Sequence, residues 1–252
     1  MVKPATAQQE IQKPRILAVI PARLGSTRLP RKVLREIAGE PMIAWVYRAA
    51  RACPLLDQVL IATDSDEVLS FAQEHNLPAV FTPEDCASGT DRVHAVAESI
   101  AADIYVNIQG DEPLLRPEHL DALLEPMARP EVEVSTLATR CSPEHVRNPN
   151  AVKVVTTANG RALYFSRATI PCDRDNAGGI LYRKHLGIYA YRKGALQRFP
   201  GLPPSALEAA EKLEQLRFLE NGIDIYVADT PYDTIGVDTE EDLRAVEAIL
   251  SR

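Results

Sequence analysis

Metal-binding cysteine motifs, long apolar runs and an excess of basic residues are all missing from this sequence of 252 residues. Cys53, Cys86, Cys141 and Cys172 are too widely spaced to form a CxxC pair, so we expect reduced thiols and neither a zinc site nor a redox motif. Because no apolar run approaches about 18 residues, we expect no membrane span. The formal net charge of −7 argues against nonspecific nucleic-acid binding, which needs a clustered basic excess.

The sequence also has no low-complexity linker, no internal repeat and no secretory hydrophobic region. Residues 1–14 are polar and carry no apolar period, so we predict a disordered N-terminal extension and a cytoplasmic protein. The hydrophobic fraction of 46% is ordinary for a soluble globular protein, and the length allows one large or two small domains. We predict a single domain over residues 15–252.

Apolar runs alternate with helical periods in the first half of the chain. Expected strands span residues 16–20, 59–62, 79–81 and 104–108. Expected helices span residues 42–50, 66–75, 91–101 and 117–127. Strands that alternate with helices of this length predict an α/β fold with a mostly parallel, doubly wound sheet. Ligands of such sheets bind beyond the carboxyl ends of the strands.

The pattern changes after residue 127. Strand-like stretches lie close together at residues 132–138, 151–157, 161–165 and 185–191. Asn159-Gly160 predicts a hairpin turn between two of them, so this part of the fold is expected to be a small mixed or antiparallel sub-region. A helix over 205–219, a strand over 223–228 and a closing helix over 239–250, with Thr239 as N-cap, are expected to follow.

The loop after the first expected strand is rich in cations. Neither the Walker pattern nor GxGxxG is present, but residues 21–32 hold Arg23, Arg28, Arg31 and Lys32 together with two hydroxyls and a glycine. Backbone that a ligand can approach closely, with positive charge beside it, is what a triphosphate requires. The alternative is a solvated basic loop.

Two acidic loops are candidates for a metal site. Asp111 follows the apolar strand 104–108 in the string QGDEP, and Asp238 precedes the last helix in GVDT. Mg²⁺ prefers one or two carboxylates plus phosphate oxygens, so both are candidate ligands. On local grounds alone, Asp111 could instead form a turn with an Asx hydrogen bond and Asp238 could favour the positive end of the helix.

Nine strings in the same order, from about Ile16 to Ala248, closely resemble the 3-deoxy-manno-octulosonate cytidylyltransferases. They are PARLGSTRLPRK, TDSDEV, SGTDR, NIQGDEPL, NPNAVKVV, ALYFSRATIPCDRD, HLGIYAYRKGAL, LEQLRFLENG and GVDTEEDL. The resemblance implies an α/β nucleotidyltransferase that is commonly a homodimer. It also implies Mg²⁺-dependent transfer of CMP from CTP to the eight-carbon acid sugar 3-deoxy-manno-octulosonate (KDO), with release of CMP-KDO and pyrophosphate.

The resemblance also implies roles for individual residues. Expected CTP ligands are Arg23, Ser26, Thr27, Arg28, Lys32, Ser88, Gly89 and Thr90, of which Thr90 alternatively serves only as a helix N-cap. Expected KDO ligands are Gln109, Arg167, His185, Tyr189, Glu214 and Gln215. Asp111 and Asp238 are the expected Mg²⁺ ligands, and together with Arg28 and Lys32 they form the expected catalytic set.

The sequence departs from the family pattern in places. Arg31 stands where a glycine is expected and Val33 where a proline is expected, which leaves the local conformation of the loop open. Cys172 replaces an expected tryptophan, and the stretch 175–182 is shorter than in many relatives. An altered sugar such as an amino-substituted KDO therefore stays open. The rival functions are a cytidylyltransferase for another acid sugar, such as a sialic acid, and a nucleotide-binding module without catalysis.

Overall fold

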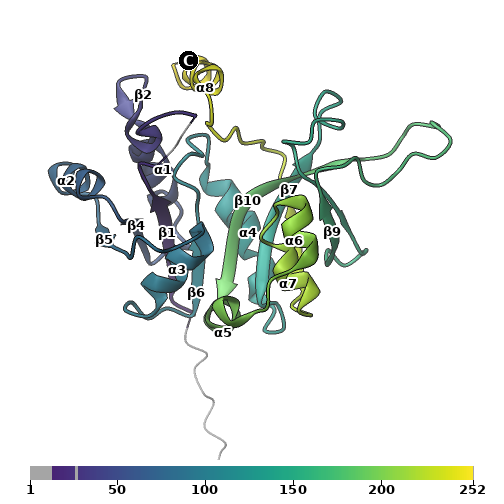
Figure 1. Cartoon of the computed structure of the whole chain (residues 1–252), viewed down its shortest axis with the longest axis horizontal. Helices are drawn as coiled ribbons and strands as arrows, with labels where there is room; N and C mark the ends of the chain where they lie inside the picture. The colour runs from purple at the N-terminus through teal and green to yellow at the C-terminus, as the bar shows by residue number, and fades with distance from the viewer. Residues whose placement is uncertain (1–12, 26–27, 252) are drawn as a thin grey trace, which may run out of the picture.

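The computed structural model describes residues 13–25 and 28–251 (Figure 1). Most of the extension predicted for residues 1–14 lies outside the described residues, and so do Ser26 and Thr27 of the cationic loop.

A central sheet forms the middle of the molecule, with strand order β11-β7-β10-β6-β1-β4-β5. These strands are β1 (Ile16–Ala22), β4 (Gln58–Thr63), β5 (Ala79–Phe81), β6 (Ile104–Asn107), β7 (Val134–Arg140), β10 (Arg183–Arg192) and β11 (Ile225–Asp229). Only β10 runs antiparallel to its neighbours along this path; the other pairs are parallel. The prediction of a mostly parallel sheet is therefore confirmed.

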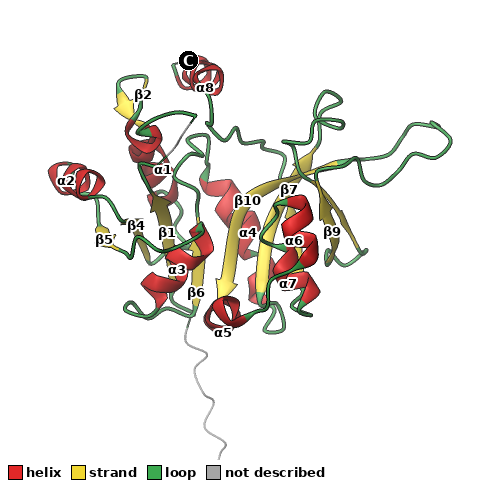
Figure 2. Cartoon of the chain, in the orientation of Figure 1, coloured by secondary structure: helices red, strands yellow, loops and turns green. Residues whose placement is uncertain are grey.

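Helices cover both faces of the sheet (Figure 2). They are α1 (Met42–Arg51), α2 (Asp66–Glu74), α3 (Gly89–Ala97), α4 (Pro117–Leu124), α5 (Lys193–Arg198), α6 (Ala206–Glu211), α7 (Leu216–Glu220) and α8 (Glu240–Leu250). Within the described residues, no helix is both long enough and apolar enough to cross a membrane.

The burial of strand β1 on both faces explains why its sequence is continuously apolar. Ala18 and Ile20 pack in one core with residues of α1, α2 and α4, whereas Leu17 and Val19 pack in a second core with residues of α3, α5 and α7. Because both faces of the strand are covered, no position along it is left for a polar side chain.

The predicted mixed sub-region is confirmed beside β10. Strands β8 (Lys153–Thr156) and β9 (Ala162–Ser166) pair antiparallel, and β8 also pairs antiparallel with β10. Gly160 in the connecting turn has φ +86°, a conformation that glycine adopts without steric cost.

A third cluster holds α8 against the cationic loop. Leu243 and Val246 of α8 pack with Leu29 and with Val237, the residue before Asp238. Thr239 caps α8, as expected, by accepting a hydrogen bond from the Asp242 amide. The two loops that carry Lys32 and Asp238 are therefore joined by a small apolar core.

Five short elements were not predicted from the sequence. They are the strands β2 (Glu36–Ile37) and β3 (Glu40–Pro41) and the 3₁₀ turns η1 (Lys32–Leu34), η2 (Pro126–Ala128) and η3 (Phe199–Gly201).

The prediction of one helix over residues 205–219 is wrong. Helix α6 ends at Glu211, Lys212 adopts a left-handed conformation with φ 55°, and α7 begins only at Leu216. Arg167 Nε donates to the Glu211 carbonyl oxygen over 2.7 Å, and the Glu211 carboxylate accepts from Ser166 Oγ (2.6 Å) and the Arg167 amide (2.9 Å). These tertiary contacts stabilise a break that the helix-forming composition of the segment does not indicate.

Candidate active site

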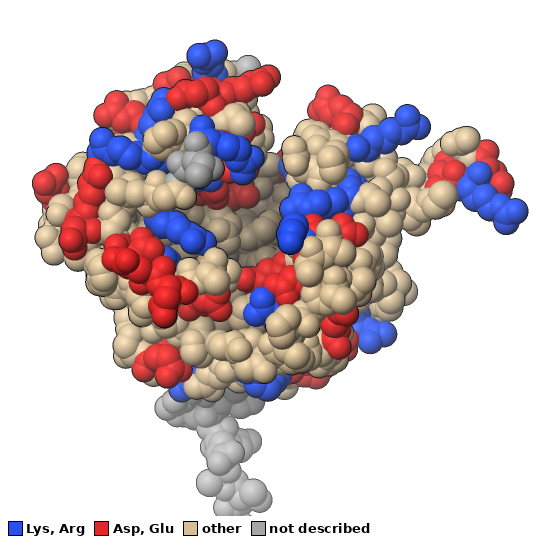
Figure 3. All heavy atoms as spheres, in the orientation of Figure 1, with Lys and Arg blue, Asp and Glu red and all other residues tan. Residues whose placement is uncertain are grey.

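Two adjoining cavities open where β1 and β6 end and α3 begins. The first, of about 360 Å³, is lined by Pro21, Arg23, Gly25, Arg28, Lys32, Val33, Ser88, Gly89, Arg92, Gln109, Gly110, Asp111 and Asp238. The second, of about 270 Å³, is lined by Gly89, Thr90, Asn107, Gln109, His185, Gly187, Tyr189, Leu213, Glu214 and Gln215. Gly89 and Gln109 line both, so the cavities form one cleft, and Figure 3 shows a hollow with charged side chains on its rim.

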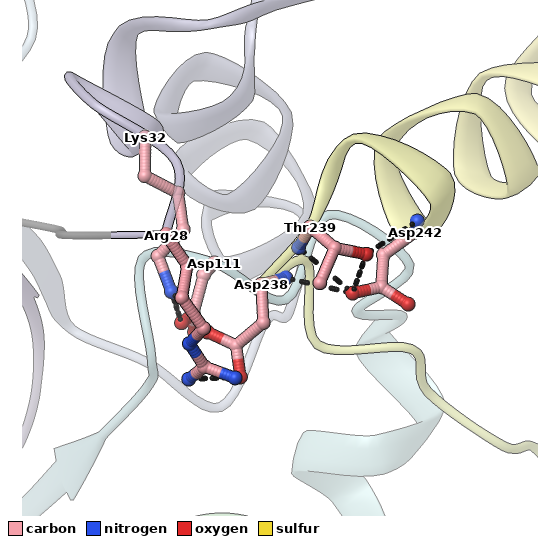
Figure 4. Close-up of polar contacts among 6 residues, drawn as sticks. All are labelled: Arg28, Lys32, Asp111, Asp238, Thr239 and Asp242. Carbon is pink, nitrogen blue, oxygen red and sulfur yellow. Dashed lines mark hydrogen bonds and ion pairs between the residues drawn. The ribbon is translucent and has the colours of Figure 1, made fainter.

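Lys32 stands between the two predicted metal ligands in the first cavity (Figure 4). Its Nζ lies 2.5 Å from Asp111 Oδ2 and 2.9 Å from Asp238 Oδ1, and Arg28 donates to Asp238 Oδ2 over 2.9 Å. Burial acts to lower the pKa of Lys32, but the two carboxylates outweigh it and raise that pKa above its ordinary value. Burial likewise acts to raise the pKa of Asp238, but Lys32 and Arg28 hold it below its usual value. The four predicted catalytic residues thus meet at one point.

The backbone around Asp111 is held closely by its neighbours. The Val237 amide donates to the Asp111 carbonyl oxygen over 2.9 Å, which ties the two acidic loops together. On the other side, a Cβ built at Gly110 would lie only 2.8 Å from the carbonyl oxygen of Pro21 at the end of β1. The position of Asp111 therefore depends on the absence of a side chain at residue 110.

We expect Gly110→Ala to destabilise the protein by about 1–3 kcal/mol and to weaken turnover, because the new methyl group must displace backbone that carries either Asp111 or the cationic loop. Thermal unfolding and turnover of the purified variant measure both effects. Gly201→Ala is the matched control, since a Cβ at Gly201 would meet nothing within 4 Å. Wild-type values for Gly110→Ala would show that this contact has no part in placing Asp111.

The backbone conformation of residue 31 explains why a glycine is expected at this position in the cationic loop. It has φ 56° and ψ 31° at the start of η1, in the left-handed region where a non-glycine residue costs about 1–2 kcal/mol. Its guanidinium forms an ion pair with Glu67 of α2, and both side chains are largely exposed, so the pair offsets little of that cost. Although arginine stands at residue 31 where a glycine is expected, Lys32 still lines the first cavity, so the loop keeps its basic character.

The start of α3 forms the wall opposite the cationic loop. Ser88, and not Thr90, is the N-cap: its side chain accepts from the Asp91 amide, and the Asp91 carboxylate accepts from the Ser88 amide. Arg23 donates to the carbonyl oxygen of Ala87 over 3.2 Å, so it already spans the cavity toward this helix. Amides at a helix N-terminus suit an anionic ligand.

Arg92 was not predicted as a site residue. It lines the first cavity but its side chain is only 1% exposed, and it forms an ion pair with Asp64 at 2.5 Å and a hydrogen bond with Thr82. In the sequence, the only indication that Arg92 belongs to the site was its place in the string SGTDR. Burial and pairing with residues distant in the sequence could not be predicted from that string.

Several polar side chains line the second cavity, and no lysine or arginine is among its described lining residues. Thr90 bonds both Glu214 and the Tyr191 hydroxyl, and burial raises the pKa of Glu214. In the part of the chain that the structure describes, two buried lining atoms, the Tyr189 hydroxyl and Gln215 Nε2, have no hydrogen-bond partner. Unpaired buried polar atoms are costly, which indicates a ligand there.

His185 is buried beside these atoms and stays neutral, because burial lowers its pKa to about 3. Its Nε2 lies 3.0 Å from Thr136 Oγ1, which itself donates to the Ile188 carbonyl oxygen at 2.8 Å. Because the Thr136 hydroxyl donates its single proton to a carbonyl oxygen, it can only accept a hydrogen bond from the His185 ring. We therefore assign the ring proton of His185 to Nε2, which leaves Nδ1 as a hydrogen-bond acceptor.

Arg167 lies apart from the other predicted sugar ligands. It lines neither cavity, because its guanidinium donates to the carbonyl oxygens of Glu211, Pro149 and Lys212. These contacts hold the break between α6 and α7, which carries Glu214 and Gln215 into the second cavity. Asn107, Gly187 and Leu213 also line that cavity and were not predicted; Gly187 stands in the string HLGIY, but nothing in the string distinguishes it.

A cationic loop at the carboxyl ends of a parallel sheet, two converging carboxylates and an adjoining polar cavity define a nucleotidyltransferase of the α/β class. A family model described as cytidylyltransferase matches residues 17–225. The 3-deoxy-manno-octulosonate cytidylyltransferase of Acidobacterium capsulatum is 73% identical over 235 residues, covering 93% of this chain and 96% of the relative. That of Koribacter versatilis is 63% identical over 234 residues, covering 93% and 89%.

A solved structure of CMP:2-keto-3-deoxy-manno-octonic acid synthetase complexed with CTP is similar to this chain with a TM-score of 0.90 and 44% identity, covering 94% of this chain and 98% of that one. The chain belongs to the 3-deoxy-manno-octulosonate cytidylyltransferase family.

Proposed function

We propose that the protein transfers CMP from CTP to the anomeric hydroxyl of KDO, releases pyrophosphate, and so activates KDO for lipopolysaccharide biosynthesis. The observation that carries this proposal is the joined pair of cavities: one is cationic and holds converging carboxylates, and the other is polar with unpaired buried groups. Gly89 and Gln109 line the junction, where the two substrates would meet.

The first cavity suits the nucleotide. Arg23, Arg28 and Lys32 would bind the triphosphate, joined by Ser26 and Thr27 of the same loop, while Ser88 and Gly89 at the start of α3 would lie by the cytidine. The anomeric oxygen of KDO attacks the α-phosphorus as the bond to pyrophosphate breaks. Arg28 and Lys32 would neutralise the charge that builds up on the leaving group, an effect worth about 3–4 kcal/mol per well-placed donor.

The donor set at Asp111 and Asp238 fits a magnesium ion. Both carboxylates reach one ammonium nitrogen at 2.5 and 2.9 Å, so they converge on a point that a cation can occupy. Among the described residues, no three histidine, cysteine, aspartate or glutamate side chains are placed so that they could hold one metal ion together, so two protein ligands plus phosphate oxygens is the expected set. When bound, Mg²⁺ would neutralise phosphate charge and lower the pKa of the attacking hydroxyl.

The second cavity suits the sugar. Tyr189 and Gln215 offer unpaired polar groups, His185 offers a neutral acceptor, and Gln109 lies at the junction with the nucleotide. Thr90 bonds Glu214 and would place that carboxyl against a sugar hydroxyl. Arg167 would contact KDO only by leaving its three carbonyl partners, so we assign it to holding the loop of Glu214 and Gln215.

We further propose that the protein acts in the cytoplasm as a homodimer. Family resemblance supports the dimer, as do two exposed apolar side chains, Leu163 of β9 (55%) and Leu181 just before β10 (63%). Light scattering on the purified protein distinguishes a dimer from a monomer.

Pyrophosphate release tests the reaction. The purified protein is assayed with CTP and Mg²⁺, with and without KDO, beside a sialic acid and an amino-substituted KDO. We expect release that depends on both KDO and Mg²⁺. Release with only an altered sugar would overturn the sugar assignment, and CTP binding without release for any sugar would point to a non-catalytic module.

A further inference from the structure

Gly187 lies in the middle of the wall that β10 presents to the second cavity. His185, Gly187 and Tyr189 alternate along the strand, and all of them line that cavity. Leu186 and Ile188, between them, pack into the core on the opposite face. Residue 187 therefore lies on the face of β10 that borders the second cavity.

Gly187 lies where the pairing of β10 with β7 shifts register, between Leu186 and Tyr189, but neither a left-handed φ nor close packing requires a glycine there. Its φ is outside the left-handed region, and a Cβ built on it would meet nothing within 4 Å. By contrast, Gly160 has φ +86° and Gly110 is closely approached by backbone. A glycine inside a strand weakens it relative to alanine by about 0.5–1 kcal/mol, and it commonly marks a bulge or a place where a ligand approaches the backbone closely.

The open space beside Gly187 lies among groups that need a ligand. Gln215 and Tyr189 line the same cavity, and the buried Gln215 Nε2 has no hydrogen-bond partner among the described residues. A side chain at residue 187 would project into this space beside the rings of His185 and Tyr189, whose centroids lie 5.5 Å apart. The glycine thus keeps clear the room that these polar groups surround.

We propose that Gly187 is a specificity-determining residue, whose bare backbone leaves the space in which the acid sugar packs against β10, beside His185 and Tyr189. This inference rests on the proposed function, because it takes the occupant of the second cavity to be KDO. It assigns to Gly187 an effect on the sugar alone, since Gly187 does not line the nucleotide cavity.

Gly187→Ala and Gly187→Val test the inference by steady-state turnover. One added methyl group in a fitted pocket changes specificity by roughly 10- to 200-fold, so we expect a KM for KDO at least about tenfold higher with alanine and a larger loss of kcat/KM with valine. The KM for CTP should stay within about twofold. The Tm of Gly187→Ala should equal or exceed that of the wild type, because alanine lowers the entropy of the unfolded chain.

Gly201→Ala is the matched control, because Gly201 also has open space, no left-handed φ and no place in either cavity. Its KM values should match the wild type. If the wild type turns over KDO and Gly187→Ala does so with the same KM, the inference is wrong while the proposed function stands. If the wild type does not turn over KDO, both are wrong. Should Gly187→Val fail to fold, Gly187→Ala decides.

Discussion

Asp111→Asn and Asp238→Asn are each expected to lower turnover by at least about a hundredfold while the protein stays folded. Each substitution removes one carboxylate from the pair that converges on Lys32, and a phosphoryl-transfer site depends on neutralising charge at that point. Asparagine keeps the shape of aspartate, so the backbone contact between Val237 and Asp111 can persist. Pyrophosphate release at saturating Mg²⁺, together with a thermal unfolding curve, measures activity and fold separately.

Asp121→Asn provides the matched control for this pair, because Asp121 is exposed on α4 and lines neither cavity. Its turnover should be that of the wild type. The stability of Asp238→Asn should change by no more than about 1 kcal/mol, because the Asp238 side chain is 43% exposed, its partner Arg28 is 66% exposed, and its other partner, Lys32, keeps its ion pair with Asp111. A near-normal rate for either site variant at saturating Mg²⁺ would rule out the two-carboxylate site.

Lys32→Met is expected to lower kcat/KM for CTP by about 10²–10³, the loss found when one preorganised donor to a developing charge is removed. Lys32 is the least exposed of the charged side chains in the contacts at this point, at 14%, and it lies within 3 Å of both carboxylates. Methionine keeps most of the length of the side chain but no charge. The loss should therefore report the ammonium group and not the packing.

A second measurement separates the role of Lys32 from a general loss of structure. Without the ammonium, Asp111 and Asp238 face each other with no cation between them, so added Mg²⁺ should raise the Tm of Lys32→Met more than that of the wild type. Lys193→Met, at the exposed start of α5, should match the wild type in both assays. Turnover of Lys32→Met within about threefold of the wild type would exclude Lys32 from the catalytic set.

Local sequence patterns predicted the strands and turns whose own residues carry the signal. Strand β1 is apolar throughout because helices cover both of its faces, and the turn at Asn159-Gly160 needs a positive φ at the glycine. The cationic loop and the loop of Asp111 were predicted because parallel strands bring their carboxyl ends to one edge of the sheet, whereas Asp238 was identified by its place before the last helix and by the family resemblance. The contacts among Lys32, Asp111 and Asp238 agree with that expectation.

Other features depend on residues far apart in the chain. The segment 205–219 has the composition of a helix, yet Arg167 and Ser166 at the end of β9 bond Glu211 and interrupt it. Those contacts also place the Arg167 guanidinium outside the cavity that its motif suggested. Propensity describes a residue and its chain neighbours, so it cannot register a hydrogen bond made across 44 positions.

The sequence by itself determined the class of fold, the family and the loops that bring charge to the active site, because each depends on an order of residues along the chain. Only the tertiary structure decided which of those residues converge, which support the site from outside, and where a missing side chain leaves open space beside the second cavity. Lys32 is an example of a residue that converges with others, Arg167 supports the site from outside, and Gly187 is the position without a side chain. The physical reason is that packing and hydrogen bonds join segments whose separation in sequence carries no signal of their contact.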